Sequence, residues 1–221
     1  MISIGRLEKE ILPCYRIVQI MIGRDGTLIK QELIIGRYDC PENQTQGDFS
    51  VDLLRSNIAV FGTAMSGKTT LLKTILLRLH QHINVTEKEE VYILDFSNNL
   101  DTYKNLPYVV AYFDAFQEEN IRRIFRVVEK KYEENIALLP GKSFLDVDHD
   151  NDDYKKLHHV TFIIDGLNAF MSDDHYSAYH DVLKKISRDG ISKGVSVIFT
   201  AHDATNGINR LLSSFNTIIA F

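Results

Sequence analysis

The sequence contains no run of apolar residues approaching the ~20 that a helix needs to cross a bilayer. Its first residues, MISIGRLEKEIL, have neither the basic start nor the long apolar core of a signal peptide. There are only two cysteines, Cys14 and Cys40, and they lack the CxxC spacing, so free thiols are favoured over a disulfide framework. These absences predict a soluble chain in the cytosol.

The chain also lacks any long block of lysine and arginine. Its basic clusters are short, as at Arg122, Arg123 and Arg126, and its formal net charge is −5. A tight grip on a DNA duplex usually requires a basic face that neutralises several phosphates. The acidic balance therefore argues against nucleic acid as a partner, although a local patch would still permit contact.

The first fifty residues differ in pattern from the rest. Two β-rich runs, residues 14–22 and 27–35, flank the segment Gly-Arg-Asp-Gly at 23–26, and Asp-Gly between such runs is a strong hairpin signal. Residues 39–48 are polar and contain Pro and Gly, which predicts a loop. We therefore expect residues 1–50 to form an N-terminal β-hairpin appendage and a lead-in loop.

From residue 51 to residue 221 the pattern alternates between strand and helix. We expect helices at residues 69–82, 118–138, 176–188 and 207–212. Short runs that are apolar on both faces predict buried parallel strands, at residues 58–61, 91–94, 109–113, 160–164, 195–200 and 217–221. This order predicts a three-layer α/β/α domain with a mainly parallel sheet. Because the chain stops at Phe221 inside its last strand, we expect a fragment of a larger protein.

A phosphate-binding loop is the clearest motif in the chain. Gly62 to Thr69 read GTAMSGKT, which satisfies G-x-x-x-x-G-K-[ST] between a buried strand and an amphipathic helix. In such a loop the glycines let successive backbone N–H groups point at phosphates, the lysine neutralises charge, and the Ser/Thr hydroxyl meets Mg²⁺. The predicted nucleotide-binding residues are Gly62, Thr63, Ala64, Met65, Ser66, Gly67, Lys68, Thr69 and Thr70. The predicted ligand is ATP with Mg²⁺.

A phosphate-loop ATPase also needs an Asp at the end of a buried strand to hold the Mg²⁺ shell. Asp165 ends the run HVTFIID, and Asp95 ends the run VYILD. Asp165 is preferred because a long separate helix is expected after its strand, and Asp95 is the competitor. Thr69 and Asp165 are therefore the predicted Mg²⁺ residues.

The residue after Asp165 is unusual for an ATPase. Enzymes of this strand class usually place Glu or Asp there to polarise water, whereas this chain has Gly166. Asn168 could position water weakly, but an amide is no base. Binding should therefore survive, while hydrolysis should be impaired. His202, at the end of the next strand, is either a γ-phosphate sensor or a surface histidine.

Four segments together resemble the FtsK/SpoIIIE family of ring-forming ATPases. They are IGRYDCPENQTQGDFSVDL, NIAVFGTAMSGKTTLLKTIL, VTFIIDGLNAF and ISRDGISKGVSVIFTAHDATNGINRLLSSFNTIIAF. Within the family, the chain is similar to the last ATPase module of the membrane coupling protein of type VII secretion. The resemblance implies a RecA-like core, neighbouring ATPase modules in a membrane secretion complex, export of small helical substrates, and a place at the cytoplasmic face of the cell membrane.

The resemblance leaves three functions open. The favoured one is an ATP-binding module of the secretion ATPase, with weak or partner-dependent hydrolysis. The second is a true motor whose arginine finger comes from a neighbouring module, with Arg188 and Arg210 as candidates. The third is a DNA translocase, against which stand the acidic balance and His202, where translocases of the family carry Gln.

Overall fold

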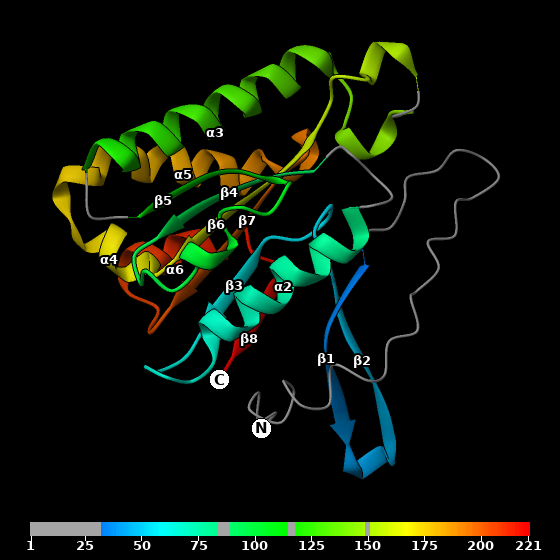
Figure 1. Cartoon of the computed structure of the whole chain (residues 1–221), viewed down its shortest axis with the longest axis vertical. Coiled ribbons are helices and arrows are strands. Elements are labelled where there is room, and N and C mark those ends of the chain that lie inside the picture. The colour runs from blue at the N-terminus through cyan, green and yellow to red at the C-terminus, as the bar shows by residue number, and fades with distance from the viewer. Residues whose placement is uncertain (1–31, 84–88, 115–117, 149–150) are drawn as a thin grey trace.

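The computed structural model describes residues 32–83, 89–114, 118–148 and 151–221 (Figure 1). The strands are β1 (Glu32–Cys40), β2 (Thr45–Asp52), β3 (Ile58–Phe61), β4 (Glu89–Asp95), β5 (Val109–Asp114), β6 (His159–Asp165), β7 (Val195–Ala201) and β8 (Thr217–Ala220). The α-helices are α2 (Lys68–Ile83), α3 (Glu118–Leu138), α4 (Leu167–Ser172), α5 (Ser177–Asp189) and α6 (Asn206–Leu212).

Six of these strands form one parallel sheet in the order β5-β4-β6-β7-β3-β8. The carboxyl ends of the central strands are in register: Asp95 pairs with Asp165, Asp165 with Thr200, and Phe61 with Ala201. Segments that follow β3, β4, β6 and β7 therefore meet at one edge of the sheet. Ligands of open α/β sheets bind at this edge.

Helices cover both faces of the sheet (Figure 1). Helix α2 and the β1–β2 hairpin bury Ile58, Val60 and Ile163 on one face. Helices α3, α4, α5 and α6 bury Phe162 and Ile164 on the other. Successive side chains of a strand point to opposite faces of the sheet. A strand that is apolar at every position must therefore be covered by other elements on both faces. The expected three-layer α/β/α architecture is confirmed.

The six expected strands of the sheet and the helix at 118–138 are present. The helix expected at 176–188 is present as α5, but the stretch that joins Asp165 to it holds an element that was not expected. It forms the short helix α4, a break at Asp173, a 3₁₀ turn from Asp174 to Tyr176, and then α5. Asp173 accepts the backbone N–H of His175, which is the side-chain bond that starts the 3₁₀ turn.

An antiparallel N-terminal hairpin is present and consists of β1 and β2. The expected strand at 14–22 and the turn at 23–26 lie outside the described residues, whereas β1 and β2 pair antiparallel from Glu32–Asp52 to Cys40–Thr45. The prediction of a loop at 39–48 was wrong. Pro41 starts a 3₁₀ turn that Gln44 closes in the left-handed region at φ 49°. The segment is polar because this end of the hairpin is exposed on both faces.

Candidate functional site

The phosphate-loop residues form a tight curl between β3 and α2. Two of them adopt positive φ, Met65 at 61° and Gly67 at 107°. A Cβ atom on Gly62 would lie 2.4 Å from the Ser66 hydroxyl oxygen, so a larger residue there would force Ser66 to shift. A turn of this kind, followed by the first unpaired N–H groups of a helix, makes a concave site for an anion.

The Ser66 hydroxyl lies inside this curl. Its oxygen is buried and has no hydrogen-bond partner among the described residues. An unpaired buried polar group is expensive, at about 1–3 kcal/mol, and such groups often mark where a ligand binds. The curl therefore fits a ligand that supplies hydrogen-bond acceptors.

The Lys68 ammonium group lies against the same loop. Its Nζ atom donates to the carbonyl oxygen of Gly62 at 2.6 Å and to that of Thr63 at 2.7 Å. An ammonium group has three hydrogens, so one remains for a ligand. The remaining predicted loop residues are arranged around it: Thr63, Ala64 and Met65 are exposed, and Thr70 is half-buried in the first turn of α2.

Asp165 faces the phosphate loop from the end of β6. Its side chain is 2% exposed, and its Oδ2 atom accepts the Thr69 hydroxyl at 3.1 Å. The hydroxyls of Ser97 and Thr200 also donate to this carboxylate. The structure thus brings together the two residues that the sequence assigned to Mg²⁺. Magnesium is commonly held by one or two carboxylates and the phosphates of its nucleotide.

Asp95, the competing carboxylate, accepts hydrogen bonds from the turn after β4 and from Tyr112 on β5. It accepts the N–H of Ser97 at 2.9 Å, the N–H of Leu100 at 2.8 Å and the hydroxyl of Tyr112 at 3.0 Å. Burial, together with the nearby Asp95 carboxylate, raises the pKa of Tyr112 above its usual range. Asp95 therefore organises the turn after β4 rather than facing the loop.

Gly166 has a backbone conformation that suits glycine and few other residues. Its φ is 92°, in the left-handed region, and a Cβ atom there would lie 3.0 Å from the Cβ of Phe96. Its N–H donates to the Thr200 hydroxyl oxygen at 2.8 Å. A side chain at this position would carry backbone strain whatever its chemistry.

Asn168 joins the start of α4 to the segment after β7. Its Nδ2 donates to Asp203 Oδ1 at 2.6 Å and to the Asp203 carbonyl at 3.2 Å, and its Oδ1 accepts the His202 N–H at 2.8 Å. Both amide protons are thereby used within the protein. Asn168 consequently holds the segment that carries His202.

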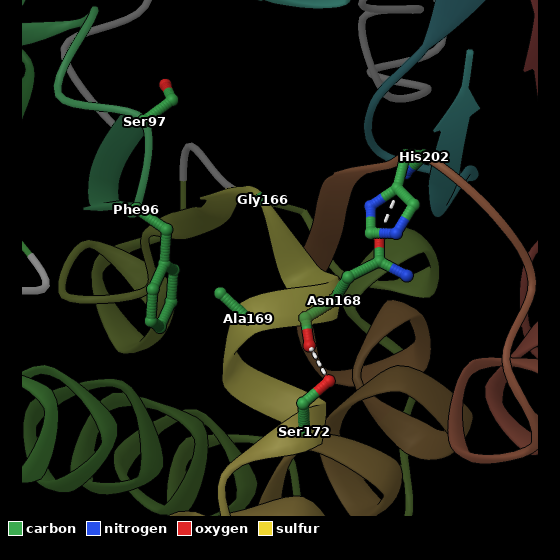
Figure 2. A pocket seen from close by; sticks show the side chains of 7 residues that line it. All are labelled: Phe96, Ser97, Gly166, Asn168, Ala169, Ser172 and His202. Atoms are coloured by element: carbon green, nitrogen blue, oxygen red, sulfur yellow. Dashed lines mark hydrogen bonds between the residues drawn. The ribbon is translucent and has the colours of Figure 1, made fainter. Parts of the chain in front are cut away.

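An open pocket of about 330 Å³ lies beside Gly166 (Figure 2). Its walls are Phe96, Ser97, Gly166, Asn168, Ala169, Ser172 and His202. The His202 ring lies at the mouth next to Asn168, with 63% of its side chain exposed and its Nε2 atom 3.4 Å from Asp203 Oδ1. His202 therefore lines the pocket at this edge of the sheet, with most of its side chain exposed.

The two candidate arginines, Arg188 and Arg210, lie on exposed surface. Arg188 binds Asp189 at 2.9 and 2.8 Å at the end of α5, beside Ser187, whose carbonyl accepts from Asn57 at the start of β3. That is the edge of the sheet opposite the phosphate loop. Arg210 is exposed on α6.

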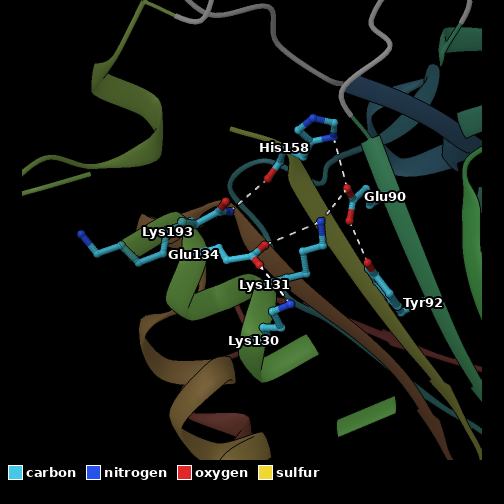
Figure 3. A network of polar contacts seen from close by, with 8 residues as sticks. Glu90, Tyr92, Lys130, Lys131, Glu134, His158 and Lys193 are labelled. Atoms are coloured by element: carbon cyan, nitrogen blue, oxygen red, sulfur yellow. Dashed lines mark hydrogen bonds and ion pairs between the residues drawn. The ribbon is translucent and has the colours of Figure 1, made fainter. Parts of the chain in front are cut away.

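A second polar cluster ties α3 to the opposite edge of the sheet (Figure 3). Glu90 contacts Lys131 at 3.1 Å and His158 at 3.3 Å, and it accepts the Tyr92 hydroxyl at 2.7 Å. Burial, followed by the bond to Glu90, raises the pKa of Tyr92 above its usual range. This cluster fixes a helix to the sheet and has no part in the loop chemistry.

Ser97 and Thr200 were not singled out from the sequence. Thr200 was visible only as the last residue of an apolar run, and Ser97 only as a hydroxyl two residues past Asp95. Their convergence on Asp165 depends on strand order and register, which one sequence does not reveal.

In the part of the chain that the structure describes, no helix is long and apolar enough to span a bilayer. Among the same residues, no three His, Cys, Asp or Glu side chains gather as a metal cluster.

Comparison with known proteins places these features in a family. A model of the FtsK/SpoIIIE family matches residues 34–220. The type VII secretion system protein EssC of Staphylococcus aureus strain MRSA252 is 26% identical over 192 residues, which are 86% of this chain and 13% of EssC. The ESX secretion system protein EccC of Geobacillus thermodenitrificans strain NG80-2 is 28% identical over 188 residues, 84% of this chain and 12% of EccC.

Solved structures agree with the sequence relatives. The structure of EssC (ATPases 2 and 3) from Geobacillus thermodenitrificans superposes with a TM-score of 0.76 at 26% identity, covering 88% of this chain and 37% of that one. The chain thus corresponds to a small part of each relative, and the part it matches has the fold of an ATPase module.

Proposed function

Because the chain belongs to the FtsK/SpoIIIE family, we propose that it is an ATP-binding module of a type VII secretion ATPase, with weak or partner-dependent hydrolysis. The observation that carries the proposal is the contact between Thr69 and Asp165 behind a curled phosphate loop. A hydroxyl and a carboxylate held together at a helix N-terminus suit a Mg²⁺–nucleotide complex.

The residues present fit ATP and magnesium. The loop amides and Lys68 would hold the phosphates, and the buried Ser66 hydroxyl would gain a partner. Thr69 and Asp165 would hold Mg²⁺, directly or through water. When bound, the metal would neutralise part of the phosphate charge.

The proposal of poor hydrolysis is supported by the segment after Asp165. Gly166 offers no proton acceptor, and its φ of 92° with Phe96 close by disfavours any side chain there. Asn168 donates both amide protons to Asp203, so neither proton is available to orient water. A missing general base typically lowers a rate by about 10²–10⁴.

The partners and the location are proposed by analogy with the relatives. Since the chain covers 13% of EssC and 12% of EccC, neighbouring ATPase modules, small helical secreted substrates and a site at the cytoplasmic face of the membrane are proposed for the longer protein. We propose no nucleic acid partner.

The experiment is a paired measurement on one preparation: Mg·ATP affinity by calorimetry, then steady-state phosphate release. We expect saturable binding of Mg·ATP and ATP turnover far below one per second. Turnover of several per second that Lys68→Ala abolishes would contradict it.

The alternative is a motor completed by a neighbour's arginine. Arg188 favours this alternative because it is exposed and lies at the end of the sheet opposite the phosphate loop of its own chain. It could therefore contact only a nucleotide bound by another subunit. Turnover per molecule that rises with protein concentration and is lost in Arg188→Ala would support this alternative. Turnover independent of concentration supports the binding module.

A further inference from the structure

Three hydroxyl groups from separate segments converge on the Asp165 carboxylate. Thr69 belongs to the first turn of α2, Ser97 follows β4, and Thr200 lies near the end of β7. Thr200 donates to Oδ1, while Thr69 and Ser97 donate to Oδ2. Of the two donors to Oδ2, Thr69 is itself a predicted Mg²⁺ residue, so Ser97 is the donor that can hold this oxygen while Thr69 meets the metal.

The Ser97 hydroxyl also lies 2.9 Å from Asp95 Oδ1. A hydroxyl has one proton, so it can donate to only one of the two carboxylates. Asp95 Oδ1 already receives the backbone N–H of Ser97 at 2.9 Å. Because the Ser97 hydroxyl lies closer to Asp165 Oδ2 than to Asp95 Oδ1, we assign its proton to Asp165, and the backbone bond to Asp95 holds the turn that orients it.

We propose that Ser97 is a positioning residue of the magnesium site, holding Asp165 in the orientation that meets Thr69. The inference rests on the proposed function, since it concerns how this site would bind Mg²⁺ with ATP. In metal sites, partners that hydrogen-bond a ligand orient it, and removing one typically lowers metal affinity by about 10–100-fold.

Ser97 is a suitable residue for a test because a substitution can remove its side-chain bond to Asp165 and keep its backbone bond to Asp95. The backbone N–H that maintains the bond to Asp95 survives in Ser97→Ala, and only the hydroxyl is lost. Thr200 would be a poorer choice, because it is 1% exposed and also accepts the Gly166 N–H. Ser97, by contrast, is exposed and lines the pocket beside Gly166 (Figure 2).

The matched control is Ser172→Ala. Ser172 is a second hydroxyl on the wall of the same pocket, but it donates at 2.6 Å to the Asn168 carbonyl within α4 and has no bond to Asp165. Ser97→Thr is the conservative variant, because it restores a hydroxyl at the same carbon.

The experiment measures binding of a fluorescent ATP analogue to the whole chain, first in EDTA and then over a range of Mg²⁺ concentrations. Ser97→Ala should bind as the unsubstituted chain does in EDTA, but it should need about tenfold more Mg²⁺ for half-maximal tightening. Ser172→Ala should leave this midpoint unchanged, and Ser97→Thr should bring it back. The melting temperature should be the same for all four proteins.

An unchanged Mg²⁺ midpoint in Ser97→Ala, with normal binding by the unsubstituted chain, would overturn this inference alone. Nucleotide binding that Mg²⁺ does not tighten in the unsubstituted chain would also overturn it, while leaving ATP binding in place. No nucleotide binding under any condition would overturn the proposed function together with the inference. Unfolding of Ser97→Ala would contradict the claim that the backbone bond maintains the turn.

Discussion

At the scale of single residues, the site divides into what neighbours along the chain determine and what the fold brings together. The curl from Gly62 to Lys68 is local, because its glycines and the following helix are consecutive, and for that reason its residues could be predicted from the motif. The sequence favours Asp165 for Mg²⁺, with Asp95 as the competitor. The structure places Asp165 against Thr69, because β6 lies nearer to β3 in the sheet than β4 does.

Gly166 gives a prediction at this scale. Gly166→Ala should lower the free energy of unfolding by about 1–2 kcal/mol, because an L-residue at a φ of 92° is strained. Its new Cβ would also approach Phe96 at 3.0 Å. Urea denaturation measures the effect.

Two other glycines separate the causes of that loss. Gly141, with a φ of 68° and nothing within 4 Å of an added Cβ, isolates the backbone strain, and Gly36, with no neighbour within 4 Å, serves as the control. If Gly166→Ala were as stable as Gly36→Ala, the backbone explanation for the missing side chain would be wrong.

At the scale of elements, the sheet could be predicted because its strands are apolar on both faces, and the amphipathic helix α3 because its apolar residues recur with helical period. The hairpin tip could not, because residues 39–48 are exposed on both faces and carry no alternating pattern. Helix α4 was missed for another reason: it is a short helix, too short for a periodic signal.

The tie between α3 and the sheet gives a prediction at this scale. Glu90→Ala removes the acceptor of the Tyr92 hydroxyl and the nearer of the two carboxylates that Lys131 contacts, so the free energy of unfolding should fall by about 1–3 kcal/mol. Chemical denaturation followed by circular dichroism measures it.

The matched comparison is Asp101→Ala, which breaks an exposed ion pair with Lys104 at 2.7 Å. Exposed pairs contribute about 0–1 kcal/mol. Equal losses in the two variants would show that Glu90 is an ordinary surface charge and that α3 is held by its apolar face alone.

At the scale of the whole molecule, the family and the fold agree with what the sequence indicated, while the cellular role is a proposal based on the relatives. The chain covers about an eighth of its curated relatives, so most of their length has no counterpart in it. The features that can be tested on the chain itself are its phosphate loop and its charge.

The charge gives a prediction at this scale. With 25 basic against 30 acidic residues, the chain should bind duplex DNA no tighter than about 100 µM at physiological salt. Fluorescence anisotropy with a labelled duplex at two salt concentrations tests this. Low-micromolar binding that weakens steeply with salt would instead favour a translocase.

The central claim is that the curl around Ser66 and Lys68 binds the phosphates of ATP, and the most direct measurement is a calorimetric titration of the chain with Mg·ATP. We expect saturable heat at one site per chain, and in Lys68→Ala an affinity lower by about tenfold or more, since a charge-assisted hydrogen bond contributes about 1.5–3 kcal/mol. Lys73→Ala, on the same helix, should bind as the unsubstituted chain does. A flat titration of the folded chain, or equal affinity in Lys68→Ala, would contradict the account.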